Sequence, residues 1–184
     1  MSIATDPTTE QLIAELYKID GKAEIVGGRI VMMSPTGDMP SSAGGFIYAS
    51  LLAFAKQHGG RAYPDNAAFL VNLPNRKSFS PDAAYYTGPR ARMKFLPGAP
   101  DFAAEVRSEE DYGRGAEREI IAKRADYFTA GTRVVWDVDL LSDDVVRVHR
   151  ADSPEQPTIY RRGETAEAEP AVPGWTFSVD ELFK

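Results

Sequence analysis

The chain has 184 residues, of which 43% are hydrophobic and 26% charged, and its formal net charge is −6 at pH 7. This length suits one domain with its own core, so we expect a single domain over residues 1–184. The lack of cysteine excludes disulfides and thiolate metal sites, and the presence of only two histidines argues against a histidine-based zinc site. The net negative charge argues against broad, charge-driven binding of nucleic acid.

The sequence predicts no membrane segment and no signal peptide. Residues 1–6 lack a basic region followed by an apolar core. No apolar run approaches the ~20 residues that are needed to span a bilayer. We therefore expect a cytoplasmic protein that does not contact a membrane.

The first third of the chain predicts two helices separated by a β-hairpin. Thr8 and Gln11 have the spacing of a capping box, which indicates a helix over residues 8–19. Two short apolar runs around a Gly-Gly pair predict a hairpin over residues 23–33. Apolar residues then recur at helical spacing over residues 42–58.

The rest of the chain predicts several strands and one further long helix. The helix is expected over residues 117–130, because Gly131 is well placed to end it. The strands are expected over residues 61–73, 81–87, 101–106, 133–138, 145–150, 158–161 and 176–179, with a terminal helical turn over 180–184. This order of elements predicts an α/β fold with a central mixed β-sheet flanked by helices.

Two Pro-Asp dipeptides open apolar runs and introduce the candidate site residues. The first supplies Asp82, and the second opens the run that contains Glu105. A carboxylate inside an apolar run is costly unless it is paired or bound to a cation. Two carboxylates at strand ends and a nearby lysine have the chemistry of a metal-dependent phosphodiesterase, and Mg²⁺ or Mn²⁺ would suit such oxygen ligands.

The helical pattern of residues 117–130 does not decide which basic residue supplies the positive charge of this site. Lys123 falls at the edge of the apolar arc, and Arg124 falls nearer its middle. The alternative interpretation is structural. Asp82 then belongs to a turn, and Glu105 forms a buried ion pair with Arg107, Lys123 or Arg124.

A set of short segments occurs along the chain in a characteristic order. The segments are Glu24-Ile25-Val26-Gly27-Gly28-Arg29-Ile30, Met33-Ser34-Pro35, Ser80-Pro81-Asp82, Pro100-Asp101-Phe102-Ala103-Ala104-Glu105-Val106, Lys123 to Gly131, Val135-Trp136-Asp137-Val138-Asp139 and Pro173-Gly174-Trp175. Together these segments resemble the Uma2 family of restriction-type endonucleases, within the PD-(D/E)XK nuclease superfamily. The resemblance spans roughly residues 16–183, and no single segment carries it alone.

This resemblance implies a restriction-endonuclease-like core and metal-dependent hydrolysis of DNA. It implies that Asp82 and Glu105 bind Mg²⁺ or Mn²⁺, that Lys123 assists catalysis and that Glu24 is an accessory acid. The position two residues after the acidic ligand, where the superfamily often has its lysine, holds Arg107. Many relatives have a histidine soon after the Ser-Pro loop, where this chain has Pro40-Ser41-Ser42.

A homodimer is the expected assembly, because two subunits often cut two strands and two-fold pairs are the commonest oligomers. The alternative function is that of a non-catalytic interaction or scaffold protein. In that case the acidic residues of the nuclease-like fold form a structural ion-pair network. The net negative charge favours this alternative over DNA as the partner.

Overall fold

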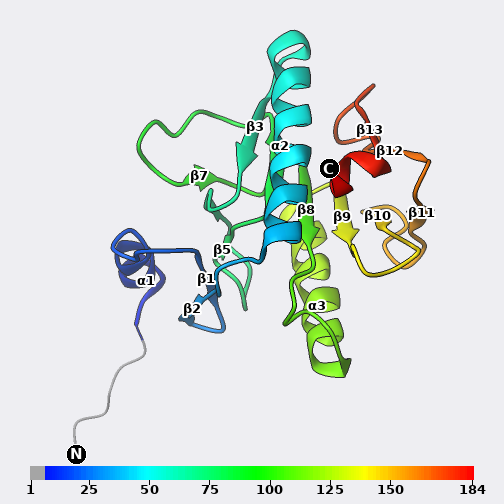
Figure 1. Cartoon of the computed structure of the whole chain (residues 1–184). Helices are drawn as coiled ribbons and strands as arrows, with labels where there is room; N and C mark the ends of the chain where they lie inside the picture. The colour runs from blue at the N-terminus through cyan, green and yellow to red at the C-terminus, as the bar shows by residue number, and fades with distance from the viewer. Residues whose placement is uncertain (1–6) are drawn as a thin grey trace, which may run out of the picture.

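A six-stranded mixed sheet forms the centre of the protein in the computed structural model, which describes residues 7–184 (Figure 1). Its strands follow the order β11-β10-β9-β8-β6-β3. Their bounds are β3 Arg61–Pro64, β6 Ala83–Tyr86, β8 Phe102–Val106, β9 Val134–Val138, β10 Val146–Arg150 and β11 Thr158–Tyr160. The expected α/β fold with a central mixed sheet is confirmed.

Strands β6, β8 and β9 are mostly apolar along their length because both faces of the sheet are covered. Helix α2, Asp38–His58, packs on one face together with the C-terminal segment, where Ile47 and Leu51 meet Trp136 and Trp175 in one core cluster. Helix α3, Arg114–Ala130, covers the other face, where Tyr127 stacks on Phe79 with ring centroids 3.9 Å apart.

Strands β8 and β9 are the one parallel pair within this six-stranded sheet, and α3 is the crossover between them. Their register places Glu105 beside Asp137. Gly131 ends α3 in the left-handed conformation at φ 108°, as the sequence predicts. Glu105 and Lys123 therefore belong to one β-α-β unit.

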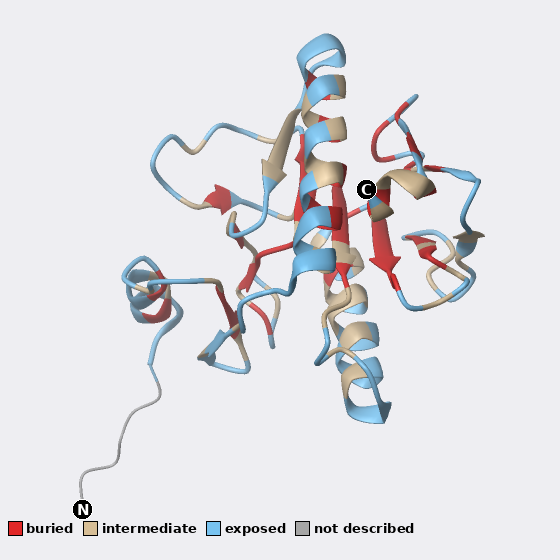
Figure 2. Ribbon diagram, in the orientation of Figure 1, coloured by how far each residue is buried: buried red, intermediate tan, exposed pale blue. Residues whose placement is uncertain are grey.

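The remaining elements form small sheets around the central one. Helix α1, Thr9–Leu16, packs against the hairpin of β1, Ala23–Val26, and β2, Arg29–Met32, which is a separate two-stranded sheet. The other short elements are β4 Phe69–Leu70, β5 Ser78–Phe79, β7 Leu96–Pro97, β12 Thr165–Glu167, β13 Thr176–Ser178 and η1 Val179–Phe183. Figure 2 shows that the buried residues concentrate on the central strands and on the inner side of α2.

The structure differs from the sequence prediction at several elements, including the unexpected short strands β5 and β7. The single strand expected over 61–73 is divided into β3 and β4, because the chain turns through Asn66, whose φ is 65°. Helix α2 begins at Asp38 rather than at residue 42, since Pro40 lies in its first turn, where a missing amide hydrogen costs nothing. A short strand, β12, forms within 165–167 and was not expected.

Two expectations concern the ends and surroundings of the chain. The expected lack of a signal peptide rests on residues 1–6, which lie outside the described residues. Within residues 7–184, no helix combines the length and the apolar composition that crossing a bilayer requires.

Candidate active site

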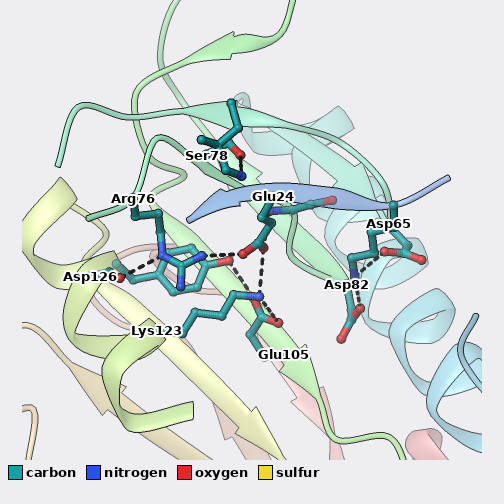
Figure 3. A network of polar contacts seen from close by, with 12 residues as sticks. Glu24, Asp65, Arg76, Ser78, Asp82, Glu105, Lys123 and Asp126 are labelled. Carbon is teal, nitrogen blue, oxygen red and sulfur yellow. Dashed lines mark hydrogen bonds and ion pairs between the residues drawn. The ribbon is translucent and has the colours of Figure 1, made fainter. Parts of the chain in front are cut away.

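A cavity of about 630 Å³ opens between the β1–β2 hairpin, the ends of β6 and β8, and helix α3. Among the residues that line it are all four predicted site residues, Glu24, Asp82, Glu105 and Lys123. Figure 3 shows the side chains of Glu24 and Glu105 at the amino group of Lys123, with Asp82 to one side of them. Residues that are up to about 100 positions apart in the sequence therefore share one concave site.

The sheet register brings Asp82 and Glu105 together. Strands β6 and β8 are antiparallel neighbours, and Ala83 pairs with Ala104. Asp82 lies one residue beyond this pair and is therefore opposite Glu105, and side chains in such opposite positions lie close together. The Asp82 carboxylate is fixed further, because the backbone amide of Val106 donates to its Oδ2 at 2.7 Å.

Lys123 places its ammonium group between two carboxylates. Its Nζ lies 2.9 Å from Glu105 Oε1 and 3.0 Å from Glu24 Oε1. Burial by itself would lower the pKa of Lys123, but the charges of Glu105 and Glu24 reverse this and raise it. Lys123 is therefore a fixed positive charge at the floor of the cavity.

Glu24 is the most deeply buried member of the site, with 1% of the residue exposed. Its Oε1 accepts a hydrogen bond from the amide of Ser80 at 2.8 Å, and its Oε2 pairs with Arg76. Burial would raise the pKa of Glu24, yet the charges of Lys123 and Arg76 outweigh it and lower the pKa. Arg76 in turn bonds Asp126 at 2.8 Å, which extends the network to α3.

Glu105 is the carboxylate with the least complete charge compensation. Its side chain is 26% exposed to the cavity, and Tyr127 donates to its Oε1 at 2.6 Å. Burial raises its pKa, Lys123 opposes that effect, and the negative charge of Asp82 adds to the rise, so that the pKa stays above its ordinary value. An additional positive charge at this position would stabilise the ionised form.

The structure distinguishes among the three cations that the sequence left open. Arg107 forms a two-pronged pair with Asp137, at 2.7 Å for both contacts, and also bonds Glu117. Arg124 lies 3.9 Å from Asp137. Of the three, Lys123 is the one that contacts Glu105.

Several residues of this network were not among the predicted site residues. Tyr127, Arg76 and Lys22 all line the cavity. Lys22 lies with its Nζ 2.7 Å from Asp82 Oδ1 and equally close to Asp65 Oδ1. Burial would lower the pKa of Lys22, but the charges of Asp82 and Glu105 raise it. Spacing gave no signal for these contacts, because Lys22 and Asp82 are 60 residues apart.

The donor set of the site suits a hard divalent cation. Asp82 and Glu105 offer carboxylate oxygens, which Mg²⁺ and Mn²⁺ prefer. Within residues 7–184, no three acidic or histidine side chains cluster closely enough to enclose an ion by themselves. Mg²⁺ commonly binds through one or two carboxylates and retains several waters, so the two carboxylates fit this mode.

The family model of Uma2, described as putative restriction endonuclease, matches residues 10–180. The chain therefore belongs to the Uma2 family, as the sequence resemblance predicted. A crystal structure of a putative nuclease belonging to DUF820 from Anabaena variabilis ATCC 29413 is similar, with a TM-score of 0.71 and 17% identity over 94% of this chain and 97% of that chain. At this identity the similarity confirms the nuclease-like fold. No curated protein matches the chain.

Proposed function

We propose that this protein is a metal-dependent endonuclease that hydrolyses phosphodiester bonds of DNA. The observation that carries the proposal is the set of Asp82, Glu105 and Lys123 at one cavity, with Lys123 Nζ 2.9 Å from Glu105. Membership of the Uma2 family supports the nuclease assignment. The proposed ligands of Mg²⁺ or Mn²⁺ are Asp82 and Glu105.

The metal ion, when bound, would activate a water molecule and stabilise negative charge on the phosphate. Asp82 and Glu105 would hold the ion through oxygens that the paired strands β6 and β8 keep in fixed positions. Lys123 would place a positive charge beside the reacting phosphate, which stabilises the charge that develops in the transition state. Glu24 would orient Lys123 from the buried side, because their atoms lie 3.0 Å apart.

Plasmid cleavage in the presence of Mn²⁺ or Mg²⁺ tests this proposal. Wild-type protein should convert supercoiled DNA to nicked or linear forms, whereas Asp82→Asn and Glu105→Gln should cleave at least about 100-fold more slowly. Asp180→Asn is the matched control, since Asp180 belongs to the C-terminal η1 and bonds Arg162. Metal-dependent cleavage that survives both site variants would refute the assignment of the ligands.

A second function also has a specific observation in its favour. Each acidic residue of the site already has a basic partner: Lys22 for Asp82, Lys123 for Glu105, and Arg76 for Glu24. This arrangement supports a non-catalytic interaction protein in which the ion pairs only stabilise the fold. In that case Glu105→Gln should destabilise the protein, and calorimetry should detect no Mn²⁺ binding by wild type.

The acidic surface and the assembly state belong to the same proposal. The net charge of −6 predicts that DNA contacts are local to the cavity, where Arg29 and Arg124 are among the lining residues. A homodimer would place two such cavities on one duplex, which would suit the cutting of both strands. Light scattering with and without a DNA duplex would measure the assembly state.

A further inference from the structure

Lys22 lies at the proposed metal site without belonging to the set of residues that the proposed reaction uses. It comes directly before β1, and its ammonium group reaches the Asp82 carboxylate with an Nζ–Oδ1 distance of 2.7 Å. Both side chains are only 14% exposed. A charged lysine is thus held against the oxygen atom that the proposed metal ion would use.

We propose that the ammonium group of Lys22 competes with the divalent ion for Asp82. When the ion binds, Lys22 leaves Asp82 and stays paired with Asp65. This inference rests on the proposed function, because it assumes that Asp82 is a metal ligand. It adds a residue that regulates how the same site is loaded. Lys22 is here a positioning residue and contacts neither the ion nor the reacting atoms.

The competition follows from charge and distance. Asp82 Oδ2 is bound by the Val106 amide, so Oδ1, the oxygen beside Lys22, is the one that has no backbone donor. An ammonium group and a divalent ion cannot both lie at ligand distance from this oxygen without strong repulsion. Lys22 must therefore move away from Oδ1 before the ion reaches its full coordination.

Asp65 provides the place to which Lys22 moves. Its Oδ1 lies 2.7 Å from Lys22 Nζ, the same distance as Asp82 Oδ1, and its side chain is 52% exposed. The backbone amide of Asn66 donates to that oxygen at 2.8 Å, which holds the carboxylate in position. Lys22 therefore keeps an ionic partner after it leaves Asp82, and its displacement does not leave an unpaired charge.

The arrangement has a consequence for the metal-free protein. Glu105 and Asp82 are close carboxylates in a partly buried site, and close like charges repel. Lys22 neutralises part of this charge when no metal is bound. The site can therefore stay folded while empty, at the cost of a weaker affinity for the ion.

Mn²⁺ titration calorimetry on the full chain tests the inference with two opposite substitutions. Lys22→Met removes the competitor and should tighten Mn²⁺ binding about tenfold or more. Asp65→Asn removes the alternative partner, so Lys22 stays on Asp82 and binding should weaken about threefold or more. Glu119→Gln is the matched control, because Glu119 lines the same cavity but is not an ion partner of Lys22 in the described chain.

The double variant Lys22→Met/Asp65→Asn separates this mechanism from a general loss of charge. If Asp65 acts through Lys22, adding Asp65→Asn to Lys22→Met should change the affinity no more than Glu119→Gln does. Unchanged or weaker Mn²⁺ binding by Lys22→Met would overturn the inference. An Asp65→Asn effect that persists in full without Lys22 would overturn it as well.

Asp82→Asn distinguishes failure of this inference from failure of the proposed function. If Asp82→Asn abolishes Mn²⁺ binding while Lys22→Met leaves it unchanged, the metal site stands and only the role of Lys22 is refuted. If Asp82→Asn binds Mn²⁺ as wild type does, both proposals are refuted.

Thermal unfolding in EDTA adds a readout that needs no activity. Lys22→Met should lower the melting temperature of the metal-free protein, and Mn²⁺ should raise it by more than it does in wild type. If Lys22→Met does not fold, the comparison of Asp65→Asn with Glu119→Gln decides, since equal affinities would overturn the inference.

Discussion

Replacement of Glu24 by glutamine should destabilise the protein by about 3 kcal/mol. Glu24 is buried against Arg76 and Lys123, and the Arg76 side chain is itself only 8% exposed. Removing one partner of a buried ion pair costs about 3–5 kcal/mol, because the other charge stays buried and uncompensated. Arg76 retains Asp126, and glutamine can still accept the bond from Ser80, so we expect the lower end of this range.

Urea and thermal unfolding measure this loss. For a chain of 184 residues, about 3 kcal/mol corresponds to a fall of about 6–12 °C in the melting temperature. The difference between wild type and Glu24→Gln should shrink as the pH falls. The pKa of Glu24 is lower in the folded state than its ordinary value of 4.5, so the native protein loses stability as protons bind the unfolded chain below that pH.

Two further variants make the test specific. Glu10→Gln, on the exposed side of α1, should change the free energy of unfolding by less than about 0.5 kcal/mol. In a double-mutant cycle with Arg76→Met, the two losses should be strongly non-additive. A loss below about 1 kcal/mol for Glu24→Gln, or additive losses in the cycle, would refute the reasoning that this ion pair is energetically coupled.

Three other substitutions test the site and the sheet. Lys123→Met should slow metal-dependent plasmid cleavage by about 100-fold or more, because a charge beside the phosphate is lost, whereas Lys18→Met at an exposed position just after α1 should have no effect. Tyr127→Phe removes the 2.6 Å hydrogen bond to Glu105 and should cost about 1–2 kcal/mol in urea unfolding, with a further rise in the pKa of Glu105 measured by carboxyl NMR. Burial lowers the pKa of His149, so the stability that this residue contributes is present above pH 6.5 and falls by up to about 1.4 kcal/mol per pH unit below it. His149→Gln should reduce this slope.

Each of these expectations can fail in a distinct way. Cleavage by Lys123→Met at the wild-type rate would exclude that lysine from the transition state. An unchanged Glu105 pKa in Tyr127→Phe would show that the hydroxyl does not stabilise the ionised carboxylate. A stability slope between pH 5 and 7 that is unaffected by His149→Gln would assign the pH dependence to other groups.

The middle of the central sheet could be predicted from the sequence because β6, β8 and β9 are mostly apolar on both faces. Strand β9 is buried at all five of its positions, and β6 at all four. Such runs are recognisable without knowledge of their partners. The pairing of β8 with β9 across α3 follows from the same pattern, since a helix between two buried strands indicates a parallel crossover.

The candidate site was only half predictable, because its missing half depends on contacts between distant segments. Glu105 is recognisable as a carboxylate in an apolar run, which local sequence reveals. Glu24 has the local context of an ordinary polar strand residue, so only the family resemblance marked it, and its partner Arg76 lies 52 residues away. The position of Lys22 against Asp82 depends equally on how the hairpin docks, which no local pattern records.

The separate β1–β2 hairpin has a consequence for the lifetime of the site. The hairpin is not part of the six-stranded sheet. It attaches to the β5 region through hydrogen bonds, such as the Ile25 amide to Ser78 Oγ and the Lys77 amide to the Ile25 carbonyl, and through the ion pair of Glu24 with Arg76. It also carries Glu24, so detachment of this segment would uncover the buried end of Lys123 while the large sheet remained folded. Amide hydrogen exchange in the β1–β2 hairpin would then report how often the hairpin detaches and opens the cavity. This opening would be measured separately from global unfolding.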